Sequence, residues 1–291
     1  MRITYIGHAT LLLELEGTRI LTDPNFDERL GWLLRRVSAP GVPLDQLPKL
    51  DAILVTHAHA DHLSFRSLAL LPHDVPLFAP PTLARWLTRL GHTQAVAVAP
   101  GEQVTVGAVT VRAAQATHMG ARYGVDRWRG QANMYLMATP DRTAFFAGDT
   151  ALMPETTHLV EHALLAYDRR LDVALLPIGH APWWKPGFRR GHLTSADALE
   201  LFQRLGARYL VPYHWGTFNH VTSTAYDAIV RLRTMIEAHQ RGADVRILEP
   251  GSTLEVLGED EAPYEPPDVL TPPLRDVVNI PPPPHSPPPN A

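Results

Sequence analysis

The chain has 291 residues, enough to bury a substantial core, and its 45% hydrophobic and 19% charged residues are typical of a globular protein. A formal net charge of -4 gives no overall basic field for nucleic acid, and the absence of cysteine excludes disulfides and thiolate metal ligands. Any metal ion must therefore be held by histidine, aspartate or glutamate, and the chain has 15 histidines.

The N-terminal sequence alternates like a strand and has Arg2 as its only early basic residue, so it does not resemble a signal peptide. No apolar run approaches the length of a membrane span. We therefore expect a soluble, cytoplasmic protein with no transmembrane segment. A transient contact with a membrane surface and assembly into a homo-oligomer both stay open.

Apolar runs and turn residues predict the elements in chain order. Short apolar or alternating runs predict strands over residues 2–6, 10–16, 19–22, 52–56, 104–106, 109–114, 134–138, 143–147, 172–178 and 207–213, and two more within 244–257. Start and stop signals predict helices over 81–90, 154–167, 194–205 and 224–240, with 27–50 irregular. Turn residues at Gly107 and at Pro140-Asp141 predict two hairpins, and Thr194 to Asp197 resembles a capping box that starts the helix 194–205. This order lacks a regular βαβ alternation and predicts an α+β fold, with two β-sheets packed face to face and helices outside.

The composition changes at Pro263. Residues 263–291 hold 12 of the chain's 28 prolines, which cannot form a sheet ladder or a long helix. We therefore expect one domain over residues 1–262, followed by an extended proline-rich tail over 263–291.

Residues 51–63, DAILVTHAHADHL, place four titratable side chains directly after a run that predicts a buried strand. His57 and His59 are two positions apart, so an extended or tightly turned backbone can aim both imidazoles at one metal ion. Asp61 and His62, slightly further along, can face a second ion. This combination predicts two adjacent metal sites rather than a loop of solvated histidines.

Three further candidate ligands lie just past other predicted strands, where a sheet can gather distant side chains into one cleft: His118, Asp149 and His214. His118 is the expected third ligand of the first ion, and His214 completes the second. Asp149 follows Gly148, which permits close backbone approach, and is expected to bridge both ions. Zn²⁺ suits these ligands best, and Mn²⁺, Fe²⁺ or Ni²⁺ also fit.

In order and spacing, these ligands resemble the ligand series of the metallo-β-lactamase fold hydrolases, over residues 1 to about 256. The segments 6–26, 147–150 (AGDT) and 214–218 (HWGTF) are similar to the branch that contains N-acylphosphatidylethanolamine-hydrolysing phospholipase D, with L-ascorbate-6-phosphate lactonases as more distant relatives. His62, where Arg or Cys would be expected, differs from the true β-lactamases. The resemblance implies an αββα four-layer sandwich with a dimetal site at one edge of the two sheets.

A dinuclear metal site predicts a hydrolase in which a hydroxide shared by two metal ions attacks the substrate. The leading expectation is a phosphodiesterase acting on a phospholipid-like or other organic phosphodiester. The alternative is a lactonase or carboxylic ester hydrolase acting on a small anionic metabolite. Asp61 and Asp149 are expected to be essential for catalysis. His192, which matches a histidine near the metals in the phospholipase branch, is expected to orient the substrate or donate a proton, unless it only stabilises the start of the following helix.

The loop 180–192, HAPWWKPGFRRGH, carries the candidate substrate residues. Trp183 and Trp184 could line an apolar entrance, while Arg189 and Arg190 could meet an anionic head group. A surface loop with partly buried aromatic residues is an equally weighted alternative.

His8 is expected to support the structure rather than bind metal, and Asp23 to form a turn or accept a hydrogen bond beside the site. His73 and His92 have no expected role. A metal-stabilised scaffold with a partner-binding tail and a nuclease are two competing interpretations. The complete ligand series argues against the first, and the lack of a strongly basic surface argues against the second, so a small-molecule or lipid substrate is expected and nucleic acid is not.

Overall fold

Two β-sheets form the body of the protein in a computed structural model, which describes residues 1–31, 34–122, 128–154, 156–157, 170–179, 187–219 and 223–257. The first sheet has seven strands, in the order β15 (Thr253–Glu255), β1 (Arg2–Gly7), β2 (Thr10–Leu15), β3 (Thr18–Thr22), β6 (Ala52–Leu54), β7 (Leu77–Ala79) and β8 (Ala95–Ala97). β3, β6, β7 and β8 are parallel, and the other pairs are antiparallel.

The second sheet has six strands, in the order β14 (Tyr209–Tyr213), β13 (Val173–Pro177), β12 (Thr143–Phe146), β11 (Asn133–Ala138), β10 (Val109–Gln115) and β9 (Gln103–Val106). The two hairpins expected from turn residues, β9–β10 and β11–β12, are antiparallel. β12, β13 and β14 are parallel. The apolar sequences of β12 and β13 are buried along their whole length, and β14 is buried except at Tyr209, as is typical of strands that are covered on both faces.

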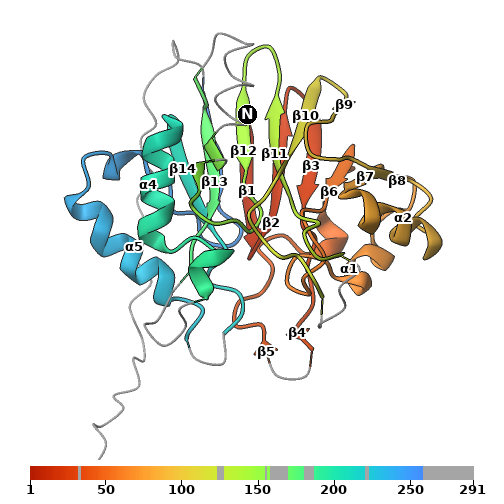
Figure 1. The fold of residues 1–291 in the computed structure, drawn as a ribbon, viewed down its shortest axis with the longest axis horizontal. Helices are drawn as coiled ribbons and strands as arrows, with labels where there is room; N and C mark the ends of the chain where they lie inside the picture. Colours follow the sequence, from red (N-terminus) through yellow and green to blue (C-terminus); the bar gives the residue numbers. More distant parts are fainter. Residues whose placement is uncertain are drawn as a thin grey trace, which may run out of the picture. The chain divides into compact units, whose positions relative to one another are not determined.

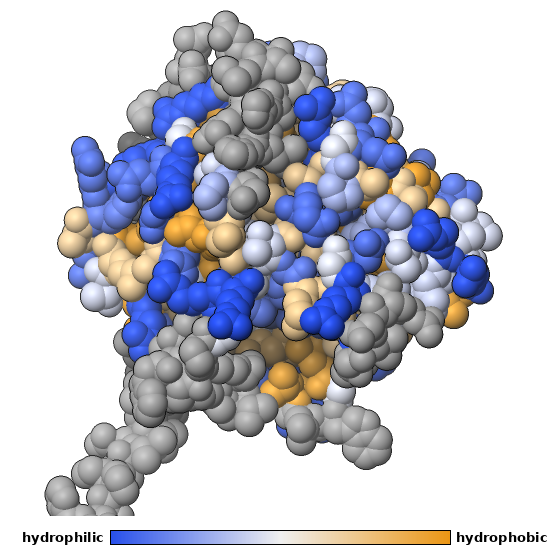
Figure 2. Space-filling view, viewed as in Figure 1, coloured by the Kyte–Doolittle hydropathy of each residue, from blue (hydrophilic) through white to orange (hydrophobic). Residues whose placement is uncertain are grey.

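The helices cover the outer faces of the two sheets (Figure 1). α1 (Phe65–Leu70) and α2 (Pro81–Arg89) pack on the first sheet through Leu68, Leu83 and Leu87. α4 (Ser195–Leu205) and α5 (Asp227–Ala238) pack on the second, and they contribute to the main core. The layers therefore follow the expected order helix, sheet, sheet, helix. The face seen in Figure 2 shows hydrophilic residues spread between smaller apolar areas.

The alternation of β2 shows how one strand serves two layers. Leu11 and Leu13 belong to the core that includes the second sheet, whereas Leu12 packs in the cluster that contains α1 and α2. Successive side chains of a strand point to opposite faces, so a strand that is apolar at every position becomes buried on both sides.

The helix α4 begins as its sequence predicts. The Thr194 hydroxyl accepts a hydrogen bond from the Asp197 N–H at 3.2 Å, and the Asp197 carboxylate accepts one from the Thr194 N–H at 3.0 Å. This capping box satisfies two backbone donors at the start of the helix. None of the helices in the described part of the chain is long and apolar enough to cross a membrane.

Several short elements differ from the expectation. Residues 27–50 contain two-residue strands, β4 (Arg29–Leu30) and β5 (Leu34–Arg35), and the 3₁₀ helix η1 (Leu44–Gln46). α1, β7 and β8 were not expected, and 244–257 holds one strand, β15, instead of two. Elements of two to six residues are too short to show a clear hydrophobic period in the sequence. Whether such a segment forms a strand depends on the segments with which it pairs.

Met1–Val256 forms one compact unit. Most of the expected helix 154–167 and the proline-rich segment 263–291 lie outside the described residues.

Candidate metal centre

The strands that carry the candidate ligands all run in a common direction within their own sheet. In the first sheet, antiparallel pairing of β1 with β2 and of β2 with β3 makes β1, β3 and β6 co-directional. In the second, β10, β12 and β14 are co-directional for the same reason. Within three residues of the ends of these six strands lie His8, Asp23, His57, His118, Asp149 and His214. Two neighbouring edges therefore deliver polar side chains to one place.

The first cluster contains His57, His59, His118 and Asp149, with one ligand atom from each residue all lying within 4.8 Å of one another. The ring centroids of His57 lie 4.6 Å from those of His59 and 4.5 Å from those of His118. His57 is fully buried, and Asp149 is 2% exposed. These four residues are the ligands that were expected to hold the first ion.

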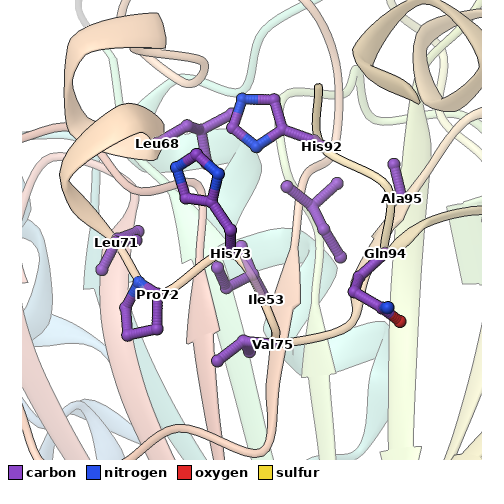
Figure 3. Close-up of a pocket in the computed structure, with 10 residues that line it drawn as sticks. Ile53, Leu68, Leu71, Pro72, His73, Val75, His92, Gln94 and Ala95 are labelled. Atoms are coloured by element: carbon purple, nitrogen blue, oxygen red, sulfur yellow. The ribbon is translucent and has the colours of Figure 1, made fainter. Parts of the chain in front are cut away.

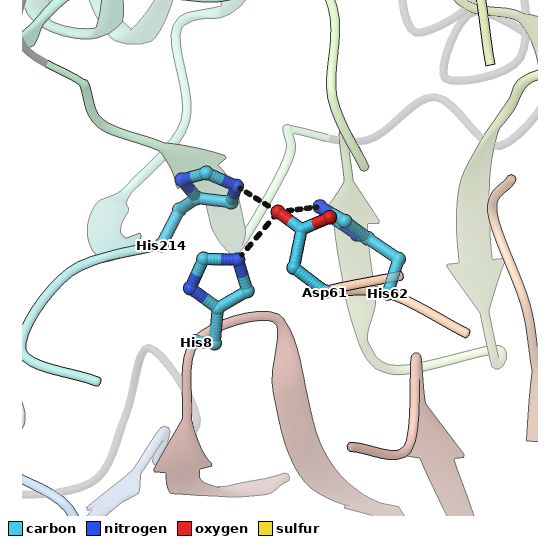
Figure 4. Close-up of side chains that lie close together, drawn as sticks. All are labelled: His8, Asp61, His62 and His214. Carbon is cyan, nitrogen blue, oxygen red and sulfur yellow. Dashed lines mark hydrogen bonds and ion pairs between the residues drawn. The ribbon is translucent and has the colours of Figure 1, made fainter. Parts of the chain in front are cut away.

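The second cluster contains Asp61, His62 and His214, joined by His8 (Figure 4). The Asp61 Oδ2 atom lies 3.7 Å from His62 Nε2 and 3.5 Å from His214 Nε2. His8 Nε2 lies 3.0 Å from the same oxygen. The structure thus brings together all three residues expected at the second ion and adds a fourth, His8.

Asp149 faces both clusters. Its Oδ2 atom lies 3.9 Å from the Nε2 atoms of His57 and His118, and 3.3 Å from His62 Nε2. Its Oδ1 atom lies 3.5 Å from His214 Nε2. One carboxylate is therefore within reach of histidines from each cluster.

Buried atoms without partners test whether metal ions fit this arrangement. Among the buried side-chain atoms that have no hydrogen-bond partner in the described part of the chain, four belong to the clusters: His57 Nε2, His62 Nε2, His214 Nε2 and Asp149 Oδ1. Leaving buried polar groups unpaired is costly, so native proteins satisfy nearly all of them. Imidazole nitrogens and carboxylate oxygens are ligands that divalent ions prefer, and the residues present fit metal binding.

Hydrogen bonds on the far side of the rings set their orientation. The Nδ1 atom of His57 lies 2.9 Å from Thr56 Oγ1. The Nδ1 atom of His62 lies 2.8 Å from Asp23 Oδ2, and His118 Nδ1 lies 2.7 Å from the Gly191 carbonyl. When each Nδ1–H donates to its oxygen, the Nε2 lone pair is directed into the clusters, which is the tautomer a metal ion requires.

Electrostatics favours the metal-binding forms of His57, His118 and Asp149. For His62, burial is outweighed by the carboxylates of Asp149 and Asp61, which raise its pKa above the usual value. Burial lowers the pKa of the His57 imidazole well below its usual value, and the nearby His62 lowers it further. Burial also lowers the pKa of His118 to about 4. Burial alone would raise the pKa of the Asp149 carboxyl, but His214 and His62 outweigh it and hold that pKa well below its usual range. Neutral imidazoles and an ionised carboxylate are the metal-binding forms.

Gly148 allows Asp149 to reach the centre. Its φ is +57°, and a Cβ at this position would lie 2.8 Å from the Cγ2 atom of Thr56. The segments before Asp149 and before His57 can therefore pack directly on each other only if residue 148 has no side chain. The close backbone approach that the glycine was expected to permit is present in the structure.

The other expected site residues do not all lie beside the clusters. His192 Nε2 lies 3.4 Å from Asp149 Oδ2, at the rim of the first cluster, with 31% of its side chain exposed. Arg189 donates to the Asp197 carboxylate at the start of α4, so it has a structural partner. Arg190 is exposed. Trp183 and Trp184 lie outside the described residues.

His73 and His92 form a separate pair away from the two clusters. Their ring centroids are 5.3 Å apart beside a small apolar pocket (Figure 3). The ten described residues that line this pocket include no carboxylate. Two imidazoles without a carboxylate make a poor metal site.

Asp23 accepts hydrogen bonds beside the site, which is one of the two roles expected for it. It is fully buried, and its donors are His62 and Thr56. His8 was expected only to support the structure, and it contacts Asp61 directly. His8 follows the end of an apolar strand, as the expected ligands do, and that shared position is the signal that could have placed it in the cluster.

Known proteins match both this chain and this fold. The beta-lactamase superfamily domain matches residues 18–215. A metal-dependent hydrolase of Opitutus terrae is 29% identical over 259 residues, covering 88% of this chain and 100% of that protein. The Caenorhabditis elegans N-acyl-phosphatidylethanolamine-hydrolyzing phospholipase D 1 is 27% identical over 259 residues, covering 81% of this chain and 70% of that protein.

Solved structures agree with the fold. The isothiocyanate hydrolase from Delia radicum gut bacteria superposes with a TM-score of 0.70 at 22% identity, covering 88% of this chain and 99% of the other. The family match spans more than half of the chain, and the His and Asp clusters lie inside it or directly beside it. The chain therefore belongs to the beta-lactamase superfamily and is a metal-dependent hydrolase with the metallo-β-lactamase fold.

Proposed function

We propose that the protein is a dinuclear metal-dependent phosphodiesterase that acts on a phospholipid-like or other organic phosphodiester. One observation carries this proposal: two ligand clusters share the single carboxylate of Asp149, and the unpartnered histidine nitrogens of both point inward. A purely structural metal site would be closed around one ion and would not need two adjacent clusters.

The ligands divide between two ions. His57, His59 and His118 would hold the first ion. The second ion would be held by Asp61, His62 and His214, and Asp149 would be shared by both. Zn²⁺ is the first choice, and Mn²⁺, Fe²⁺ and Ni²⁺ are alternatives with the same ligand types.

When bound, the two ions would activate a water molecule and polarise the phosphoryl group. The chain's own residues would then assist the proton transfer that completes the reaction. As water adds to phosphorus it gives up a proton, the bond from phosphorus to the leaving oxygen breaks, and that oxygen takes up a proton, so the products are a phosphomonoester and an alcohol. His192, whose side chain is 31% exposed and whose Nε2 atom lies 3.4 Å from Asp149 Oδ2, would deliver the proton to the leaving oxygen. No side-chain nucleophile is required.

Side chains at the rim support a substrate with an anionic group and an apolar part. Met119, which directly follows His118, is 62% exposed, and Met153, just past Asp149, is 41% exposed. Arg190 is exposed near His192 and can meet an anionic head group, whereas Arg189 would have to do so while keeping Asp197 as a partner. Trp183 and Trp184 remain proposed contributors to an apolar entrance. The similarity to the worm phospholipase also favours a lipid phosphodiester.

The test is release of p-nitrophenol from bis(p-nitrophenyl) phosphate by protein loaded with Zn²⁺ or Mn²⁺, with metal content measured on the same samples. We expect two ions per chain and metal-dependent turnover. Asp61→Ala and Asp149→Ala should lose most of it, whereas the exposed Asp45→Asn should keep it. N-acylated and ordinary phospholipids are then compared as substrates.

Two results would contradict the proposal. Full turnover in Asp61→Ala or Asp149→Ala would remove these carboxylates from the reaction. A wild-type protein that binds two ions but leaves every phosphodiester intact, while it opens lactones or cleaves carboxylic esters, would transfer the assignment to the alternative activity.

A further inference from the structure

His8 is the member of the second cluster that was not expected there, and it shares a left-handed backbone with His214. It is 6% exposed and lies directly after β1, with a φ of +55°. Left-handed backbone is unfavourable for residues other than glycine and persists where the surroundings enforce it. Its imidazole therefore occupies this position at a cost, which calls for a role beyond filling space.

The atom that faces His8 separates it from the expected ligands. His118 Nε2 and His59 Nδ1 lie 3.0 Å apart, but two imidazole nitrogens can both direct lone pairs to one ion. His8 Nε2 lies 3.0 Å from Asp61 Oδ2, and an ionised carboxylate oxygen can only accept, so the nitrogen must donate its proton there.

The hydrogen-bond partners of the Nε2 atoms also distinguish His8 from His62 and His214. The Nε2 atoms of His62 and His214 have no hydrogen-bond partner among the described residues, as expected of atoms that await an ion. His8 Nε2 has its partner already, in the Asp61 carboxylate. A nitrogen that donates its proton to a carboxylate has no lone pair to offer to a metal ion.

The backbone of His8 is tied to the segment that carries His214. The His8 N–H donates to Thr217 Oγ1 at 2.7 Å, and the His8 carbonyl accepts from the His214 N–H at 2.9 Å. The two imidazole centroids are 3.9 Å apart. His8 thus contacts two of the three residues assigned to the second ion, Asp61 by its ring and His214 by its backbone and ring.

We propose that His8 is a positioning residue for the second metal site, which donates its Nε2–H to Asp61 Oδ2 and braces His214 without binding the ion. This inference rests on the proposed dinuclear function. It makes the second site dependent on His8 while the first site, built from His57, His59 and His118, is independent of it.

Two substitutions separate the donor from the backbone requirement. His8→Gln keeps an N–H group near the position of the imidazole Nε2. His8→Asn suits the left-handed backbone, since asparagine tolerates positive φ, but its amide is too short to reach Asp61. His92→Gln, in the pair away from the clusters, is the control for loss of any histidine. Thermal unfolding in chelator checks that each variant folds.

The readouts are Zn²⁺ affinity by chelator competition and the visible absorption of the Co²⁺-loaded protein. We expect His8→Asn to bind one ion with unchanged affinity and the second 10–100-fold more weakly. His8→Gln should recover most of the second affinity and keep the Co²⁺ spectrum of the wild type, because the ligands are unchanged. His92→Gln should match the wild type.

Three outcomes would overturn the proposal. If folded His8→Gln loses the second ion as completely as His8→Asn, or shifts the Co²⁺ spectrum, His8 is a ligand. If His8→Asn binds both ions as the wild type does, His8 has no role in the site. A wild-type protein that binds fewer than two ions would instead overturn the dinuclear function itself. The metal content of the wild type is therefore measured before any variant is compared. If His8→Asn does not fold, the Co²⁺ spectrum of His8→Gln alone decides between donor and ligand.

Discussion

Replacing Asp23 by Asn should weaken both metal sites at once, although Asp23 is not expected to bind either ion. The carboxylate is fully buried and accepts three hydrogen bonds: from the Thr56 N–H at 2.7 Å, from the Thr56 hydroxyl at 2.7 Å and from His62 Nδ1–H at 2.8 Å. Because Thr56 Oγ1 also lies 2.9 Å from His57 Nδ1, one carboxylate orients a histidine of each cluster. Burial raises the pKa of Asp23, and the bonds from His62 and Thr56 oppose that rise.

The magnitude follows from the number of acceptors. Asparagine keeps the shape of Asp23 but has only one acceptor oxygen. If that oxygen serves the Thr56 hydroxyl and the His62 ring, the amide NH₂ group opposes the Thr56 N–H. One buried donor without an acceptor costs about 1–3 kcal/mol of unfolding free energy. The loss of the charged partner of His62 should lower metal affinity roughly 10–100-fold.

The assay is Zn²⁺ affinity by chelator competition, together with denaturant unfolding of the metal-free protein. Asp45→Asn, at an exposed position, is the matched control and should change neither quantity. An Asp23→Asn protein with wild-type affinity for both ions would refute the argument that this carboxylate fixes the two rings. Weakening of the second site alone would show that Thr56 does not relay the effect to His57.

Three further changes test other parts of the site. Gly148→Ala places a Cβ 2.8 Å from Thr56 Cγ2 at a φ of +57°, so denaturant titration should show a loss of about 1–3 kcal/mol. Tyr213→Phe removes the hydroxyl that donates to the Gly148 carbonyl at 2.6 Å, and it should lower Zn²⁺ affinity in competition assays, whereas Tyr226→Phe at the surface should not. In chelator, the Tm should fall as the pH drops from 6.5 toward 4: burial lowers the pKa of His118 from 6.5 to about 4, so over this range the unfolded chain binds a proton that the folded chain excludes.

Local sequence signals predicted the elements that depend on local interactions. The capping box of α4 and the turn before β10 need only neighbouring residues, and both were visible in the sequence. The three-residue strands β7 and β8 were not, because they are defined by parallel pairing with β6 and with each other. The same limit applies around the metal centre. The contact of His62 with Asp23 spans 39 positions and that of His118 with Gly191 spans 73, so no local sequence pattern can predict these contacts.

The expected ligands could be found because each follows an apolar strand, and the topology then explains why they meet. Strands that run in the same direction end at the same edge of their sheet. The residues that follow them therefore lie close together although they are far apart in the sequence. His8 carries that same signal at the end of β1. What the sequence lacks is the difference between a ligand and its support. Here that difference is the hydrogen bond from His8 Nε2 to the Asp61 carboxylate, whereas the Nε2 atoms of His62 and His214 have no hydrogen-bond partner among the described residues. A shared strand-end position therefore selects the residues of the centre, while their individual roles depend on the partner atom that each nitrogen meets in the packed structure.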